Sequence, residues 1–284
     1  MVAAMAVPPR ALFAGLVDDA ALFPPGNAPM DKGLAEHALH KAAPYGDLIG
    51  PFLCPASRIE ELVAAQPAGT PTRVALIYDV TDDAAWHARQ VALSSGRTSL
   101  AWTEAAYGRF GDDIAAVCGG MVRDQGPQAF LEVPRTGFEA ALDLVGTPGW
   151  HAAKYRTGGT AAETFPTEAE VADFLLAATA RPVPFKLTAG LHHAVRHTGA
   201  GTGFEHHGVL NVLAATKAAQ DGADRDAVAG VLAERDAAPL VEAVTSWDAG
   251  TCARVRGAFR SFGCCGVTDP IDDLAALGLL GAVT

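Results

Sequence analysis

Short apolar runs alternate with amphipathic stretches along most of this chain. Leu48–Cys54 and Arg73–Tyr78 are apolar runs of strand length, and each precedes a segment with the 3.6-residue periodicity of a helix. Strands and helices that alternate at this spacing indicate a parallel sheet. The other strands are predicted at Leu12–Val17, Thr98–Trp102, Ala129–Val133, His151–Arg156, Val183–Thr188 and Ala258–Gly263.

Helices are predicted between these strands, and Thr167 with Glu170 has the spacing of a capping box. About eight strand-then-helix units fit a (β/α)8 TIM barrel, for which about 250 residues is typical. An open doubly wound sheet is the alternative, but its glycine-rich dinucleotide motif is missing. We therefore predict a single barrel domain over residues 1–284, with an extended helical segment at about 204–257. The shorter helices are predicted at Ser57–Ala65, Asp82–Leu93, Asp112–Val122, Phe138–Val145, Thr167–Ala178 and Asp269–Gly278.

Composition narrows the classes of partner. The 284 residues carry 21 basic and 32 acidic side chains, a net charge of −11 that disfavours nucleic acid and anionic lipid. No apolar stretch reaches the roughly 18–20 residues of a membrane helix. The five cysteines are scattered, which favours reduced thiols and a cytoplasmic location. We expect a small-molecule substrate, and an Ala/Leu-rich barrel is compatible with a homo-oligomer.

Two lysines stand out at predicted strand ends, where barrel enzymes place their active sites. Lys154 and Lys186 lie among small and apolar residues, and burying an ammonium group costs several kcal/mol unless it is paired. A second cation and partial desolvation lower a lysine pKa, and the neutral amine forms Schiff bases with carbonyl compounds. Glu104 and Glu132 are the candidate proton shuttles. The alternative is that Lys154 forms a structural ion pair with one of these glutamates.

Glycines and arginines at the same strand ends suggest an anion site. Backbone N–H groups in glycine-rich loops approach a phosphate or carboxylate closely, although such glycines also simply make tight turns. Asp18 and Asp19 close the predicted first strand and are candidates to orient Lys154 or Arg156, or to cap a helix. The candidate substrate- or anion-binding residues are Arg156, Thr157, Gly158, Gly190, His192, His193, Arg196, Gly263, Cys264, Asp18 and Asp19.

The lysine segments resemble the deoxyribose-phosphate aldolase family of class I aldolases. KYRTGG at 154–159 is similar to the Lys-x-Ser/Thr-Thr-Gly segment of that family, and FKLTAGLHHAVR at 185–196 to its second lysine motif. RSFGCCG at 260–266 resembles its last-strand phosphate loop. The resemblance implies a TIM barrel in which Lys154 forms the Schiff base and Lys186 lowers its pKa. It also implies that Gly190, Arg196 and the loop at 263–266 hold phosphate.

Five of the nine histidines lie within residues 192–207. His193, His206 and His207 are the candidate ligands of a divalent metal, although no known metal motif is present. Such histidines also bind anions, transfer protons or carry no chemistry. We thus expect a lyase that uses Lys154 on a small anionic carbonyl compound and needs no cofactor. The alternatives are a metal-dependent hydrolase or isomerase using His192, His193, His206 and His207, and a non-catalytic barrel that binds small anions.

Overall fold

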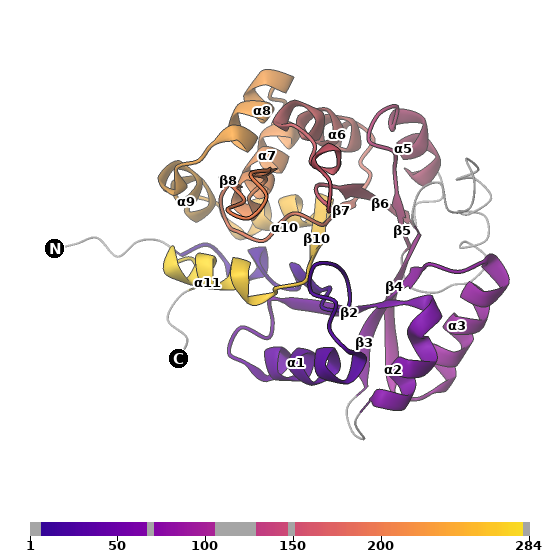
Figure 1. Cartoon of the computed structure of the whole chain (residues 1–284). Helices are drawn as coiled ribbons and strands as arrows, with labels where there is room; N and C mark the ends of the chain where they lie inside the picture. Colours follow the sequence, from indigo (N-terminus) through magenta and orange to yellow (C-terminus); the bar gives the residue numbers. More distant parts are fainter. Residues whose placement is uncertain (1–6, 67–70, 106–128, 147–150, 281–284) are drawn as a thin grey trace.

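The structure, a computed structural model, describes residues 7–66, 71–105, 129–146 and 151–280. Eight parallel strands close into a barrel in the order β1-β10-β7-β6-β5-β4-β3-β2, which confirms the predicted (β/α)8 architecture (Figure 1). The predicted helix at 112–122 lies outside the described residues. The barrel strands are β1 (Val17–Asp19), β2 (Ile49–Pro55), β3 (Thr72–Tyr78), β4 (Thr98–Ala105), β5 (Ala129–Glu132), β6 (His151–Arg156), β7 (Phe185–Thr188) and β10 (Phe259–Cys264).

Helices surround the barrel on its outer side (Figure 1). The predicted capping box is present at the start of α6, where the Thr167 side chain accepts from the Glu170 amide and the Glu170 carboxylate accepts from the Thr167 amide. The helices are α1 (Met30–Ala42), α2 (Ile59–Ala65), α3 (Asp82–Ser94), α5 (Glu139–Gly146), α6 (Glu168–Ala180), α7 (Val209–Gln220), α8 (Arg225–Ala233), α9 (Ala237–Thr245), α10 (Ala249–Ala258) and α11 (Thr268–Ala276), with short 3-10 turns at Arg10–Leu12, Ala56–Arg58 and Ala162–Thr164.

The first strand begins later than predicted. Residues Arg10–Leu12 form a 3-10 turn, and Gly15 has a φ of +57°, so the chain turns before it becomes extended at Val17. The prediction of a strand over Leu12–Val17 was therefore wrong in its bounds. Asp18 and Asp19 are the last two residues of β1.

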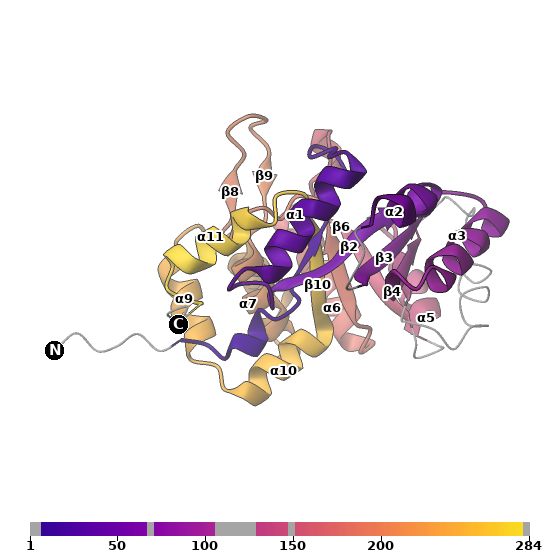
Figure 2. The same ribbon diagram turned by 90° about the horizontal axis from the view of Figure 1, so that it is seen from below.

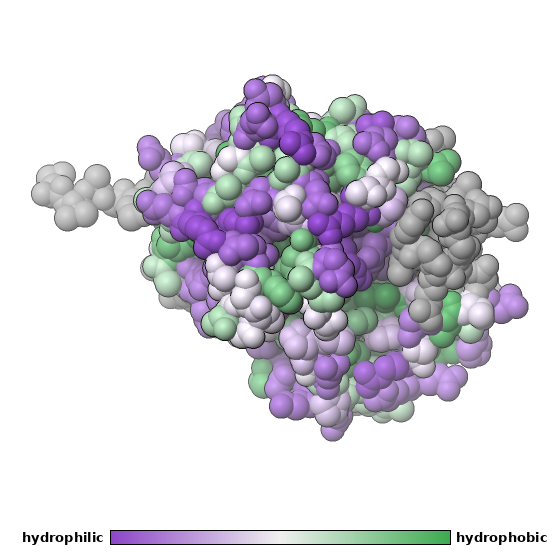
Figure 3. Space-filling model, turned by 45° about the horizontal axis from the view of Figure 1, so that its top comes forward, coloured by the Kyte–Doolittle hydropathy of each residue, from purple (hydrophilic) through white to green (hydrophobic). Residues whose placement is uncertain are grey.

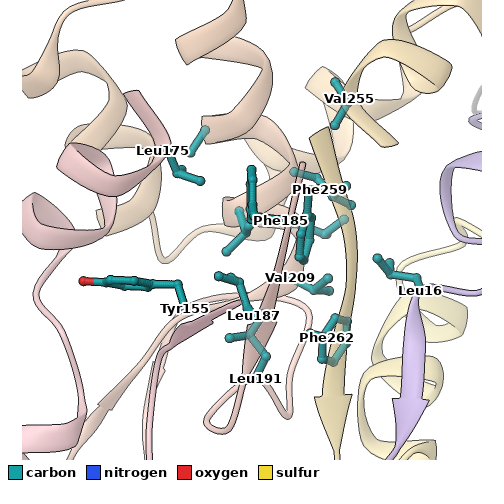
Figure 4. Close-up of a cluster of buried hydrophobic side chains, with 14 of the residues drawn as sticks. Leu16, Tyr155, Leu175, Phe185, Leu187, Leu191, Val209, Val255, Phe259 and Phe262 are labelled. Atoms are coloured by element: carbon teal, nitrogen blue, oxygen red, sulfur yellow. The ribbon is translucent and has the colours of Figure 1, made fainter. Parts of the chain in front are cut away.

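Alternation along β6 and β7 separates the two sides of the barrel wall. Tyr155 points outward and stacks on Phe174 of α6, with ring centroids 4.3 Å apart. Phe185 lies in the same outer layer and stacks on Phe259 at 5.5 Å (Figure 4). Apolar side chains thus pack the helices against the outside of the sheet. The residues that alternate with them along each strand face the barrel interior.

The region after β7 is the largest departure from simple strand-helix repetition. A hairpin of β8 (His197–Thr198) and β9 (Glu205–His206) projects from the body of the molecule (Figure 2). Helices α7 to α10 follow it. Within the described part of the chain, no helix has the length and apolar character needed to cross a membrane.

Candidate active site

The strand register brings Glu132, Lys154 and Lys186 to one level inside the barrel. Glu132 of β5 is the register partner of Lys154 of β6, and Lys154 is the partner of Lys186 of β7. Register partners in a parallel sheet point to the same face, so all three side chains enter the interior. The predicted proximity of the two lysines is therefore present in the fold, and both side chains are almost completely buried.

Lys186 is neutralised by two carboxylates from strands that are not its neighbours in the sheet. Its Nζ lies 2.7 Å from Asp18 Oδ2 of β1 and 2.5 Å from Glu104 Oε1 of β4. The ammonium also lies over the rings of Trp102 and Phe130, 5.2 and 5.6 Å from their centroids. The interior of the barrel thus holds this charge by pairing it across the lumen.

Lys154 shares one of these carboxylates with Lys186. Its Nζ lies 3.0 Å from Glu104 Oε2 and 3.4 Å from Glu132 Oε2. Glu132 in turn accepts from Arg156 Nε at 2.8 Å, and the Arg156 side chain is 45% exposed. Glu104 therefore bridges the two lysines, and Arg156 extends the cluster towards solvent.

Burial and ion pairing shift the pKa values of the two carboxyl groups beside Lys186 in opposite directions. Burial raises the pKa of Asp18 to about 6, with the Lys186 ammonium opposing only part of that shift. Burial also acts on Glu104, but the two lysines outweigh it and lower its pKa to about 2. Burial disfavours the Lys186 charge, yet Asp18 and Glu104 raise its pKa overall. Lys186 thus stays cationic, and Asp18 is the carboxyl group that takes up a proton most readily.

Three contributors to this cluster were not singled out from the sequence. Ser261 of β10 donates to Asp18 Oδ2 at 2.7 Å, and Trp102 Nε1 donates to Glu104 Oε1 at 2.9 Å. Phe130 packs against Trp102 with ring centroids 5.2 Å apart. The sequence could have pointed to Trp102, because it precedes Glu104 by two positions on a strand and must therefore face the same side.

Arg196 does not present a free guanidinium to an anion. It is buried, and its Nη2 lies 2.6 Å from Glu168 Oε1 and 3.2 Å from Glu205 Oε2. Two carboxylates already neutralise the single positive charge. The expected phosphate-binding role of Arg196 therefore has no support in the geometry, and the residue joins the start of α6 to the hairpin.

The glycines after β6 and β7 pack against each other. A Cβ on Gly158 would lie 2.7 Å from Gly190 Cα, and a Cβ on Gly190 would lie 2.5 Å from the Thr157 carbonyl oxygen. The Thr157 hydroxyl donates to the Ala189 carbonyl at 2.6 Å. Gly190 also has a φ of +83°. These contacts favour the alternative that the two glycines allow close approach of neighbouring loops.

The candidate metal ligands bind separate partners. His193 Nδ1 lies 2.9 Å from Asp273 Oδ2, whereas His206 Nδ1 lies 3.0 Å from the Gly190 carbonyl oxygen. His207 is buried and its Nε2 lies 2.9 Å from the Pro166 carbonyl oxygen. Among the residues that the structure describes, no group of three or more potential ligands has the arrangement of a metal site.

The remaining candidates also have local roles. Asp19 is buried, and its Oδ2 lies 2.9 Å from His37 Nδ1, whereas Asp18 pairs with Lys186. Lys154 and Arg156 are instead paired with glutamates. Gly263 of β10 is the register partner of Thr188 and Asp18. Cys264 ends the same strand with its thiol 3.6 Å from His192 Nδ1. The loop at 263–266 therefore carries thiol groups and contacts the imidazole of His192.

The fold and this cluster define a (β/α)8 barrel with two interior lysines bridged by a carboxylate. No protein-family model, curated protein or solved structure matches the chain.

Proposed function

We propose that this protein is a lyase of the aldolase type that forms a Schiff base on Lys154. The observation that carries the proposal is the pair of register-matched lysines, Lys154 and Lys186, joined by Glu104 inside the barrel. An amine at this depth is shielded from water, and carboxylates stand within reach of its nitrogen to move protons. The resemblance of the segments around the two lysines to the deoxyribose-phosphate aldolase family supports the same assignment.

A nucleophilic amine first has to release a proton. Hydrogen-bonding distances form an unbroken chain from Lys154 through Glu104 and Lys186 to Asp18. Glu104 holds a proton poorly, because the lysines lower its pKa to about 2, whereas burial raises the pKa of Asp18 to about 6. In this proposal Lys186 passes protons and stays cationic on average, and Asp18 stores the proton that leaves Lys154.

The proposed reaction follows from the positions of these groups. The Lys154 nitrogen attacks the carbonyl carbon, and loss of water gives a protonated imine. The bond between the α- and β-carbons of the imine then breaks, and its electron pair passes into the protonated imine to give an enamine. The hydroxyl group on the β-carbon loses its proton to Glu132, and that fragment leaves as an aldehyde or ketone. Protonation of the enamine and hydrolysis of the imine restore the amine. Glu132 Oε2, 3.4 Å from Lys154 Nζ, is close enough for that proton transfer.

Arg156 is the group best placed to meet an anionic substrate. Its side chain is 45% exposed, and its Nε bonds to Glu132 at 2.8 Å while the rest of the guanidinium extends from the same cluster. Arg156 also lies two positions beyond Lys154 on β6 and therefore faces the same side of the strand. A carboxylate or phosphate on the substrate would bind there next to the imine-forming nitrogen.

Trapping with borohydride tests the proposal. The protein is incubated with small aldehydes and ketones, reduced, and analysed by intact mass and peptide mapping. We expect a reduced adduct on Lys154 that is absent from Lys154→Gln. The surface substitution Lys32→Gln serves as the matched control and should leave the adduct unchanged. Uniform labelling of surface lysines, or no adduct with any carbonyl compound, would contradict the assignment.

A further inference from the structure

Two adjacent thiols flank one imidazole ring after β10. Cys265 Sγ lies 3.7 Å from His192 Nε2, and Cys264 Sγ lies 3.6 Å from His192 Nδ1. Asp269, in the first turn of α11, places Oδ2 3.2 Å from the same Nδ1. None of these four side chains contributes to the lysine cluster described above.

The two thiols differ in their surroundings. Cys264 is 1% exposed and donates to the Gly266 carbonyl at 3.2 Å, and burial raises the pKa of its thiol. Burial likewise raises the pKa of Cys252 and raises that of Cys54 to about 12. Among the cysteines in the described ranges, only Cys265 is not fully buried. Cys265 is therefore the thiol that an external reagent can reach.

Cys265, His192 and Asp269 stand in the order thiol, imidazole, carboxylate, which is the arrangement of an activated nucleophile. His192 Nδ1 lies 3.2 Å from Asp269 Oδ2 and Nε2 lies 3.7 Å from Cys265 Sγ, so with its proton on Nδ1 the ring would donate to Asp269 and accept from Cys265. A nucleophile next to a base that a third group orients is the general pattern for nucleophilic side chains. We propose that Cys265 is a nucleophilic thiol, activated by His192 and Asp269, that forms mixed disulfides with small disulfides.

The surroundings of Cys265 offer room for such a reagent. A hollow of about 320 Å³ lies between the start of α11 and the β1–α1 region. Its lining includes Cys265, Thr268, Glu36 and His40. The net charge of −11 and the carboxylate of Glu36 favour a small cationic disulfide over an anionic one.

Figure 3 shows that hydrophilic residues cover much of one face of the molecule, with hydrophobic residues between them near its middle.

The exchange balances without any other reactant. The Cys265 thiolate attacks one sulfur of the disulfide, a new S–S bond forms, and the old one breaks. The departing thiolate takes the proton that His192 received from Cys265. Cys264 is buried and directly adjacent in sequence, so its thiol is poorly placed to displace the attached group. The mixed disulfide should therefore persist until an external thiol removes it.

Reaction with cystamine, followed by peptide mapping across pH 5–10, tests this proposal. At pH 7 we expect Cys265 to react about tenfold faster than an ordinary free cysteine, whose pKa is about 8.5. His192→Asn should remove about that factor at pH 7, and Asp269→Asn should have a smaller effect in the same direction. Cys264→Ser should leave the Cys265 rate within about twofold, because Cys264 is not the attacking group. Peptide mapping keeps Cys118, which lies outside the described residues, separate.

The outcomes are decisive in both directions. A Cys265 rate at pH 7 no greater than that of an ordinary free cysteine, or equal rates in the unaltered protein and His192→Asn, would overturn the proposal. The titratable groups near Cys265 are His192, Cys264 and Asp269, and Asp19, Glu36 and His40 also line the hollow. The reaction rate is therefore followed in Glu36→Gln as well. Lys154→Gln should retain the full Cys265 rate, which keeps this test independent of the proposed lyase activity.

Discussion

The barrel interior and the loop after β7 both collect charged side chains, but they neutralise them in different ways. In the interior, Lys154 and Lys186 are paired with carboxylates from β1, β4 and β5, and all these groups are buried. In the loop and hairpin, Arg196 and His193 are paired with carboxylates that keep substantial contact with solvent. An interior charge that loses its partner stays desolvated, whereas the carboxylates of Glu168, Glu205 and Asp273 would still be hydrated if their partners were removed.

This difference separates a site organised for proton transfer from one organised for structure. Shared carboxylates in a low-dielectric interior couple the ionisation of several groups, which is how enzymes tune acids and bases. Solvated pairs couple weakly and serve to attach one segment to another. The following changes test whether the two regions differ as described, beginning with the largest expected effect.

Lys186→Met should have the largest effect on stability. It removes the ammonium between Asp18 and Glu104 and leaves two buried carboxylates without that partner. Breaking a buried pair costs about 3–5 kcal/mol, which urea denaturation at pH 7 would measure. The same substitution at Lys32, which pairs with Glu36 on the surface, should change the free energy of unfolding by less than about 1 kcal/mol. Equal losses of stability at the two positions would show that the interior and surface ion pairs do not differ as described.

Asp18→Asn should alter how stability depends on pH. The folded-state pKa of Asp18 is about 6 against an ordinary 3.8, so between these values the folded state binds more protons than the unfolded state. Its contribution to stability is complete below about pH 4 and is lost as pH rises to about 6, by up to about 3 kcal/mol for a shift of about two units. Glu104 acts in the opposite sense, with its contribution lost as pH falls from about 4.5 towards about 2.

Unfolding measured by calorimetry from pH 4 to 7 should show that decline in the unaltered protein and a flatter profile in Asp18→Asn. Glu168→Gln, at the partly exposed carboxylate partner of Arg196, is the matched control and should keep the decline. An identical pH profile in Asp18→Asn and the unaltered protein would show that Asp18 does not titrate in this range.

Arg196→Gln and Arg156→Gln should separate structural from ligand-binding arginines. Loss of the Arg196 bonds to Glu168 and Glu205 should lower stability by about 1–3 kcal/mol, because charged hydrogen bonds are lost from a buried guanidinium. It should leave the response to inorganic phosphate in a thermal-shift titration unchanged. Arg156→Gln should weaken that response several-fold. If Arg196→Gln weakened the response to phosphate and Arg156→Gln did not, Arg196 would be the anion-binding residue.

His193→Asn should have the smallest effect. The pair of His193 with Asp273 is 44% and 37% exposed, and exposed ion pairs contribute about 0–1 kcal/mol. Elemental analysis should give the same metal content with and without the substitution, because the candidate ligands bind separate partners. A stoichiometric metal that disappears with His193 would instead favour the metal-dependent alternative.

Much of the fold and part of the site could be predicted. The alternation of apolar runs and amphipathic segments predicted the strands and the barrel, and Thr167 with Glu170 predicted the start of α6. One strand-helix-strand unit separates Lys154 from Lys186, so adjacent parallel strands were expected to place them side by side. The structural ion pair weighed for Lys154 is also present, with both Glu104 and Glu132. What stays a prediction is that this arrangement serves Schiff-base chemistry.

Local periodicity did not predict which carboxylates pair with Arg196 and with Lys186. Arg196 lies after β7 in an irregular loop, where spacing does not fix the direction of a side chain, and its partners come from α6 and the hairpin. The first strand was placed too early because the apolar run at 12–17 hides the turn at Gly15. Asp18 and Asp19 nevertheless lie at the carboxyl end of β1.

The sequence by itself determined which residues lie on strands, which of them face inward, and which strands are neighbours, because these follow from local periodicity and the connection of parallel strands through helices. Only the tertiary structure decided that Asp18 and Glu104 meet at Lys186. Those contacts cross the lumen between strands that are not adjacent in the sheet, and closure of the barrel alone brings them within hydrogen-bonding distance.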